Sequence, residues 1–300
     1  MQKSNRFMGR WLLFASLCII WGSSFVLMKL SLFDALGAPL LSPWQVGALR
    51  IGTAGLVLLP YAFRAFRQMQ KRQLQWVMIT GLLGSFFPAF LFCLAETQLD
   101  SAITGMLNAF TPICVLLVGA VVYAQRIPPQ QVLGVALGFF GCLVLFLAQN
   151  AGTYGNWGAG GYVLLATVCY GLNVNMVKHH LADVPALSIA AVAFVFLIPP
   201  AFTILWVTGF FRLPLLTSPY VLAMGSAALL GVAGTALGSV IFYRLVKTAG
   251  SVFASLVTYG IPFVALGWGL VYGEAVSALQ VLGLAVILAG VYFANRPHRA

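Results

Sequence analysis

The chain has 300 residues, of which 61% are apolar and only 7% are charged. Soluble domains carry about 25% charged residues, so this composition excludes a soluble enzyme, a nucleic-acid-binding protein and a disordered protein. The net charge of +11 comes largely from basic residues clustered between long apolar runs, which is the pattern of membrane topology. The five cysteines lie inside those runs without a CxxC motif, so neither a disulfide nor a metal site is expected.

Apolar runs long enough to cross a bilayer recur along the whole chain, a helical span taking about 20 residues. The runs are continuous rather than alternating, which excludes a transmembrane β-barrel. The sequence therefore predicts an all-α integral membrane protein with ten transmembrane helices. The predicted spans are residues 10–29, 44–64, 73–95, 101–123, 130–148, 160–178, 186–208, 219–243, 251–272 and 279–294.

The basic residues are distributed unequally between the two ends of these spans. Of the 16 lysines and arginines, all but Lys29, Arg50 and Arg212 lie on the side that holds both termini. Cytoplasmic loops carry the excess of lysine and arginine in membrane proteins. The sequence therefore predicts a multi-pass protein of the plasma (inner) membrane with both termini in the cytoplasm.

The chain repeats itself at a shift of about 149 residues. The four residues from Gln131 to Gly134 recur identically from Gln280 to Gly283. Such an identity, with other residues in register, indicates an internal duplication. The other recurring pairs are Trp21 with Tyr170, Gly22 with Gly171, Lys29 with Lys178, Asp34 with Asp183, Gly81 with Gly231, Gly84 with Gly234, Phe92 with Phe242, Ser101 with Ser251, Pro112 with Pro262 and Gly141 with Gly290.

Each predicted repeat holds five spans, and an odd number forces the second copy to cross the membrane in the opposite sense. Inverted repeats give two halves related by a pseudo-two-fold axis in the membrane plane, an arrangement that supports alternating access. We therefore expect a first repeat over 1–148, an extracellular linker over 149–159, a second, inverted repeat over 160–294 and a cytoplasmic tail over 295–300.

Several motifs are similar to those of a known family. The sequence from Trp21 to Phe25 (WGSSF), Pro112 in the fourth span and Gly273-Glu274 after the ninth resemble EamA-type proteins of the drug/metabolite transporter superfamily. The resemblance covers about residues 10–294 as two EamA repeats, and it implies a membrane transporter rather than an enzyme, most often working outward. The chain departs from the family at Ala124-Gln125, where a Gly-Glu pair usually ends the fourth span.

Charged residues inside a bilayer are unfavourable and mark candidate functional sites. Lys29 ends the first span and Arg50 lies about two turns into the second. Either residue has a structural alternative: Lys29 can extend to the interface, and Arg50 can pair with Glu96 or with backbone carbonyls. If both face inward, they favour a substrate with a carboxylate. No acid lies in the middle third of a span, which disfavours a carboxylate-driven exporter of cationic drugs.

Uncharged polar and aromatic residues at mid-span complete the candidate site. Asn108 and Thr258 align between the repeats, each four residues before a proline that frees a backbone carbonyl. These side chains either bond a neighbouring helix or contact substrate, and Trp21 and Tyr170 either pack or line a cavity. The candidate substrate-binding residues are Trp21, Ser24, Lys29, Arg50, Glu96, Asn108, Pro112, Tyr170, Asn173, Thr258 and Pro262.

The sequence thus predicts a transporter that moves a small polar metabolite by alternating access, most consistent with export of amino acids or related carboxylate-bearing metabolites. A proton-coupled exporter of drugs or cations is the first alternative, and a non-transport membrane protein is the second. No cofactor, metal or nucleic acid is expected. The expected partners are a small-molecule substrate and the lipid bilayer, and the protein would be a monomer or a homodimer.

Overall fold

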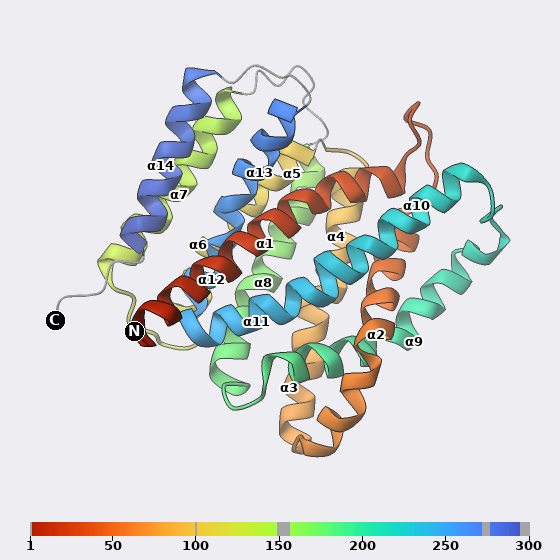
Figure 1. Ribbon diagram of the computed structural model, residues 1–300, viewed down its shortest axis with the longest axis horizontal. Coiled ribbons are helices and arrows are strands. Elements are labelled where there is room, and N and C mark those ends of the chain that lie inside the picture. Colours follow the sequence, from red (N-terminus) through yellow and green to blue (C-terminus); the bar gives the residue numbers. More distant parts are fainter. Residues whose placement is uncertain (1, 100, 149–156, 272–276, 295–300) are drawn as a thin grey trace.

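The computed structural model describes residues 2–99, 101–148, 157–271 and 277–294, and every regular element in these ranges is a helix (Figure 1). Most of the expected linker and the whole expected tail, residues 149–156 and 295–300, lie outside the described residues. The first repeat contains α1 (Gln2–Leu32), α2 (Pro43–Gln68), α3 (Lys71–Gly81), η1 (Leu82–Phe86), α4 (Phe87–Glu96), α5 (Ser101–Asn108), α6 (Thr111–Val121) and α7 (Pro129–Ala148).

The second repeat follows the same order of elements. It contains α8 (Gly160–His180), α9 (Ala186–Val207), α10 (Ser218–Leu229), η4 (Leu230–Leu237), α11 (Gly238–Ala249), α12 (Ser251–Ser255), α13 (Val257–Val271) and α14 (Ala278–Ala294), with short 3₁₀ turns η2 (Trp157–Ala159) and η3 (Phe210–Arg212).

The helices account for the predicted spans in the described part of the chain. Six continuous spans are long and apolar enough to cross a membrane, namely Met8–Leu32, Pro43–Gln68, Lys71–Glu96, Gly160–His180, Ala186–Val207 and Ser218–Ala249. Shorter apolar helices make up the remaining four predicted spans. Two of those four are broken, between α5 and α6 and between α12 and α13. The all-helical fold expected from the sequence is therefore confirmed.

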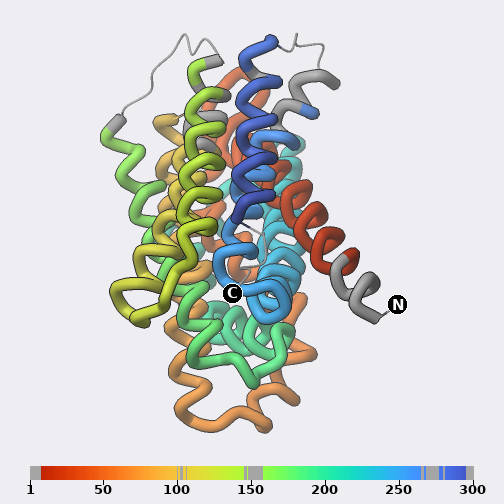
Figure 2. The backbone as a smooth tube through the Cα atoms, turned by 90° about the vertical axis from the view of Figure 1, so that its left-hand side faces the viewer, coloured from red at the N-terminus to blue at the C-terminus, as the bar shows by residue number. Residues whose placement is uncertain are grey.

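Two counterpart helices, α7 and α14, pack along their length in opposite directions (Figures 1 and 2). A Cβ atom at Gly134 would overlap the backbone of Ala294, one at Gly290 would overlap the backbone of Gly138, and one at Gly141 would overlap Ile287. Residue numbers thus rise along one helix as they fall along the other. Glycine permits this close approach, as is common between membrane helices.

The second pair of counterparts, α2 and α9, is antiparallel as well. Gly55 lies against Ile198, and nearer the other end the Gln45 side chain donates a hydrogen bond to the carbonyl of Thr208 over 3.1 Å. Since both pairs of equivalent helices run in opposite directions, the two repeats cross the membrane in opposite senses. This geometry is the inverted five-plus-five arrangement expected from the odd number of spans.

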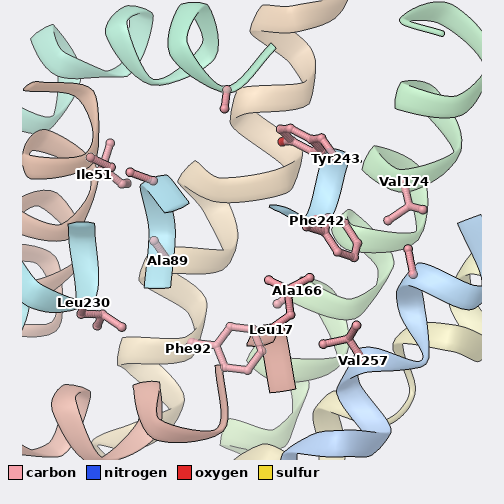
Figure 3. Packing of buried hydrophobic residues seen from close by; sticks show 14 of the residues in the cluster. Leu17, Ile51, Ala89, Phe92, Ala166, Val174, Leu230, Phe242, Tyr243 and Val257 are labelled. Carbon is pink, nitrogen blue, oxygen red and sulfur yellow. The ribbon is translucent and has the colours of Figure 1, made fainter. Parts of the chain in front are cut away.

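The core is shared by the two repeats rather than divided between them. Helix α1 packs on α13, and its counterpart α8 packs in the same way on α6. Buried side chains from both repeats therefore meet at the centre, as Figure 3 shows for Leu17, Phe92, Val174, Phe242 and Val257. The centre of the molecule is thus a place where each half contributes a wall.

Candidate functional site

A cavity of about 90 Å³ lies at this centre, enclosed by helices of both repeats. Seven of the residues singled out in the sequence line it, and these are Trp21, Ser24, Arg50, Asn108, Tyr170, Asn173 and Thr258. The other four candidates, which are Lys29, Glu96, Pro112 and Pro262, are not among its lining residues. This volume is small beside the roughly 300–1,000 Å³ of ordinary ligand pockets, so binding of a metabolite requires the surrounding side chains to rearrange.

The aromatic walls of the cavity are related by the internal repeat. The ring of Trp21 lies 5.1 Å from that of Phe242, and the ring of Tyr170 lies 6.1 Å from that of Phe92. Trp21 is the counterpart of Tyr170 and Phe92 is the counterpart of Phe242, so each pair joins one repeat to the other. Two equivalent apolar walls therefore face the cavity, suited to an apolar or planar part of a ligand.

Two π-helical segments, η1 and η4, occupy equivalent positions beside the cavity. A Cβ at Gly84 of η1 would lie 2.4 Å from the amide nitrogen of Asn173, and one at Gly234 of η4 would lie 2.9 Å from the hydroxyl of Ser24. Ser24 and Asn173 are themselves counterparts. Each π-segment thus uses a glycine to seat a polar side chain of the opposite repeat, and π-bulges of this kind are frequent at functional sites.

The wide turns of η4 also expose a backbone acceptor to the cavity wall. The indole nitrogen of Trp21 donates a hydrogen bond over 2.9 Å to the carbonyl of Gly234. This bond fixes the indole ring against Phe242 and ties α1 to η4. The Trp21 ring is therefore a positioned part of the wall.

Arg50 reaches the cavity because a capping box fixes the start of α2. The hydroxyl of Ser42 accepts from the backbone N–H of Gln45 over 3.2 Å, and the Gln45 side chain accepts from the N–H of Ser42 over 2.9 Å. Two turns further on, the Nε of Arg50 donates to the hydroxyl of Thr235 over 3.0 Å. Because the counterpart helix α9 contains no charged residue, this cation makes the cavity electrically asymmetric.

Lys29 and Glu96 form a separate ion pair at the C-terminal end of α1. Their charged atoms lie 3.7 Å apart, and the ammonium also donates to the carbonyls of Glu96 and Leu99 over 3.0 and 3.3 Å. Glu96 is fully buried and accepts a further bond from Ser101 over 2.8 Å. The expectation that Glu96 would pair with Arg50 is therefore corrected, since Lys29 neutralises this acid.

The counterpart lysine, Lys178, lies in a neutral network at the other end of the molecule. Its ammonium donates to the side-chain oxygen of Gln125 over 2.7 Å, and the Gln125 nitrogen donates to Asn175 over 2.8 Å. Gln125 occupies the place of the family's usual acid. Ala124 before it has a φ of +47°, a left-handed conformation that favours glycine.

Each of the two broken spans carries a proline four residues after a cavity-lining residue, Asn108 or Thr258. Pro112 lies in the first turn of α6, and Pro262 lies inside α13. A proline has no N–H, so the carbonyls of Asn108 and Thr258, four residues earlier, lose their helical donor. The break in the fourth span falls immediately before its proline, whereas the break in the ninth lies further upstream, at Leu256.

A larger vestibule opens at the end of the bundle where α1 begins and α14 ends. It has a volume of about 610 Å³, and its walls carry Arg10, Arg126 and Lys178. The vestibule reaches Val115, one helical turn from the cavity-lining Thr111. A thin barrier of side chains therefore separates the vestibule from the central cavity.

Comparison with known proteins agrees with this arrangement. The EamA-like transporter family matches residues 9–147 and again residues 158–296. The chain belongs to the EamA-like transporter family. It is therefore a multi-pass integral membrane transporter and not an enzyme, as the resemblance in the sequence implied.

Individual relatives of this EamA transporter are distant. An uncharacterized transporter of Archaeoglobus fulgidus is 25% identical over 296 residues, covering 96% of this chain and 99% of that protein. Probable amino-acid metabolite efflux pumps of Escherichia coli and Salmonella typhimurium are 29% and 30% identical over 128 and 139 residues. These two matches cover 42% and 45% of this chain but only 39% and 42% of the pumps.

A solved crystal structure shares the fold of the EamA transporter. It aligns with a TM-score of 0.70 and 18% identity over 96% of both chains. The likeness extends across both repeats and shows that the whole chain adopts a known architecture.

Several cavity residues were missed as site candidates in the sequence, although part of the signal was present. Gly84, Gly234, Phe92 and Phe242 recur in register, but they served only as evidence for the duplication. A residue that both copies keep at the same mid-span position is a candidate for the shared central wall. Thr235 gave no such signal, because its role depends on the path of η4 toward Arg50.

Proposed function

We propose that this EamA transporter exports amino acids or related carboxylate-bearing metabolites by alternating access. The observation that carries the proposal is the central cavity, which combines the guanidinium of Arg50 with apolar aromatic walls. Arginine binds carboxylates in bidentate geometry, and aromatic rings accommodate an apolar side chain. The names of the two partial relatives, probable amino-acid metabolite efflux pumps, support the same class of cargo.

The described cavity wall favours an anionic over a cationic cargo. Arg50 is the charged residue among its lining side chains, and Glu96 lies outside that lining and is paired with Lys29. An exporter of cationic drugs driven by a buried carboxylate would need an acid that binds proton and drug in turn. The cavity chemistry therefore supports the carboxylate-bearing class.

Alternating access is supported by the inverted repeat and by the position of the vestibule next to the central cavity. The narrow cavity lies close to the wide vestibule, and exchange of conformation between the two halves would move this opening to the other side. The fourth and ninth spans are both interrupted, after Asn108 and at Leu256, so each repeat has one span that can bend there.

A ligand screen followed by a transport assay tests the proposed function. Purified protein is melted with amino acids, with simple carboxylates and with organic cations, because a specific ligand stabilises the folded state by RT ln(1 + [L]/Kd). Ligands that raise the melting temperature are then tested for counterflow in proteoliposomes. Stabilisation and counterflow by carboxylate-bearing metabolites support the proposal, whereas a response confined to cations contradicts it.

We further propose that the protein lies in the plasma (inner) membrane with both termini in the cytoplasm and the linker over 149–159 outside. The positive charge at the vestibule, from Arg10, Arg126 and Lys178, supports this orientation. Single cysteines at Asn156 and Arg299 can be probed in intact cells with an impermeant thiol reagent. Labelling at Arg299→Cys without labelling at Asn156→Cys would show that the orientation is the opposite of the one proposed.

A further inference from the structure

The Asn173 side chain leaves one polar atom unsatisfied inside the cavity. Asn173 lies on α8, is only 2% exposed and lines the central cavity. Its amide group packs against Gly84 of η1, where a Cβ atom would overlap it. Its Oδ1 atom has no hydrogen-bond partner in the described structure. The side chain is therefore packed against η1 and offers an unused acceptor at the cavity.

A buried acceptor without a partner is unfavourable, and it calls for an explanation. Thr80 and Thr104 also have buried hydroxyls without partners in the described structure, but neither residue lines the central cavity. The Asn173 oxygen is different because a ligand in the cavity can reach it. Gly84 makes room for this amide, so the backbone of η1 is shaped around it.

Further acceptors accompany the Asn173 oxygen. Asn108 and Thr258 line the same cavity, and a proline four residues later deprives each of their carbonyls of its helical donor. Helices α5, α6 and α12, which carry the broken spans, pack against α8. These two carbonyls are candidate additional acceptors for a cation, as in other transporters where unwound backbone coordinates one.

Arg50, in contrast, offers positively charged hydrogen-bond donors to the cavity. Its Nε donates a hydrogen bond to the hydroxyl of Thr235, and its other guanidinium N–H groups have no protein acceptor in the described structure. A guanidinium cannot be deprotonated and requires acceptors for these groups. The cavity therefore has a donor pole at Arg50 and an acceptor pole at Asn173.

We propose that the cavity recognises a zwitterion, with the carboxylate of an α-amino acid at Arg50 and its ammonium group at the Oδ1 of Asn173. The apolar side chain of the amino acid lies between the walls formed by Trp21 with Phe242 and by Tyr170 with Phe92. This inference rests on the proposed function and narrows it. Asn173 is then the residue that distinguishes amino acids from carboxylates that lack the amine.

Matched ligand pairs test the proposal on the full-length protein. Leucine is compared with isocaproate, and phenylalanine with hydrocinnamate, because the members of each pair differ only by the amine. Wild-type protein should bind each amino acid at least about tenfold more tightly than its desamino analogue, the value of one hydrogen bond to a charged group. Asn173→Ala should remove this preference by weakening amino-acid binding while leaving affinity for the analogue within about threefold.

Thr80→Val is the matched control, because it removes a buried, unpartnered hydroxyl that does not line the cavity. It should keep the preference for the amine. If Asn173→Ala fails to fold, Asn173→Ser gives α8 the residue that its counterpart carries at Ser24 and should show the same loss. Thermal melting without ligand identifies which variant is folded.

The outcomes separate this inference from the proposed function. Loss of the amine preference in a folded Asn173 variant supports the zwitterion site. Equal binding of both members of each pair by wild-type protein overturns it while leaving a carboxylate exporter intact. A preference that persists in the Asn173 variants overturns it as well. Failure of all four probes to bind contradicts the proposed function itself.

Discussion

Replacing Arg50 by lysine keeps the positive charge of the cavity but removes the planar fork of the guanidinium. In the structure the Nε of Arg50 is bound to Thr235, which orients the remaining N–H groups for a bidentate contact with a carboxylate. A lysine ammonium is a compact charge that can keep one such hydrogen bond. We therefore expect Arg50→Lys to weaken substrate binding without unfolding the protein.

The size of the effect follows from the bond that is lost. A hydrogen bond that involves a charged group contributes about 1.5–3 kcal/mol, which corresponds to roughly a 10- to 150-fold rise in Kd. Arg50→Gln removes the charge as well, so its binding should be weaker than that of Arg50→Lys. The order wild type, lysine, glutamine is therefore expected for affinity and for transport.

Affinity is measured by isothermal titration in detergent and transport by counterflow in proteoliposomes. Arg64→Gln is the control, because Arg64 is an exposed arginine of the same helix that lies outside the cavity. It should bind and transport as wild type does. Wild-type affinity in both Arg50 variants would refute the role of Arg50 in binding, and absence of both variants from the membrane would assign it a structural role.

Three further substitutions test local parts of the structure by thermal melting and counterflow. Gln125→Glu gives Lys178 a counter-charge, which contributes about 0.2–1 kcal/mol at an exposed site. The same change removes the hydrogen-bond donor to the buried Asn175, which costs about 1–3 kcal/mol. The variant should therefore melt at a lower temperature than wild type, and a higher melting temperature would contradict this balance. Tyr259→Phe removes a buried 2.8 Å bond to a carbonyl of α7 and should lower stability by about 1 kcal/mol while counterflow persists; an unchanged melting temperature would count against the bond. Ala124→Gly relieves a left-handed backbone conformation and should raise stability by about 0.5–1 kcal/mol, whereas a fall would show that the conformation is unstrained.

The fold could be predicted in large part because its determinants repeat along the chain. Apolar runs gave the spans, and the identical stretch beginning at Gln131 and Gln280 gave the duplication. An odd number of spans in each copy then required the inversion. The antiparallel packing of α7 on α14 follows from the same facts, since Gly134 and Gly141 permit the contact.

The candidate site could be predicted less completely, because side-chain partners depend on how helices cross. The sequence predicted that Lys29 and Arg50 could both face the substrate, yet of the two only Arg50 lines the cavity. Glu96 forms an ion pair with Lys29, because the end of α4 lies beside the end of α1. The π-segments η1 and η4 were also hidden, since a single extra residue in a helical turn leaves no mark on hydropathy.

The relation between symmetry and chemistry in the cavity bears on the proposed transport of an amino acid. The features that let the halves exchange conformation occur in both copies: the π-segments, the broken spans and the paired aromatic walls. The features that recognise a cargo occur once. Arg50 has no charged counterpart on α9, and Asn173 corresponds to Ser24, whose hydroxyl is already donated to the carbonyl of Ile20. The proposed zwitterion, which has two different ends, would therefore have one preferred orientation in a site whose walls are otherwise nearly two-fold symmetric, and alternating access requires it to keep that orientation while the helices around it move.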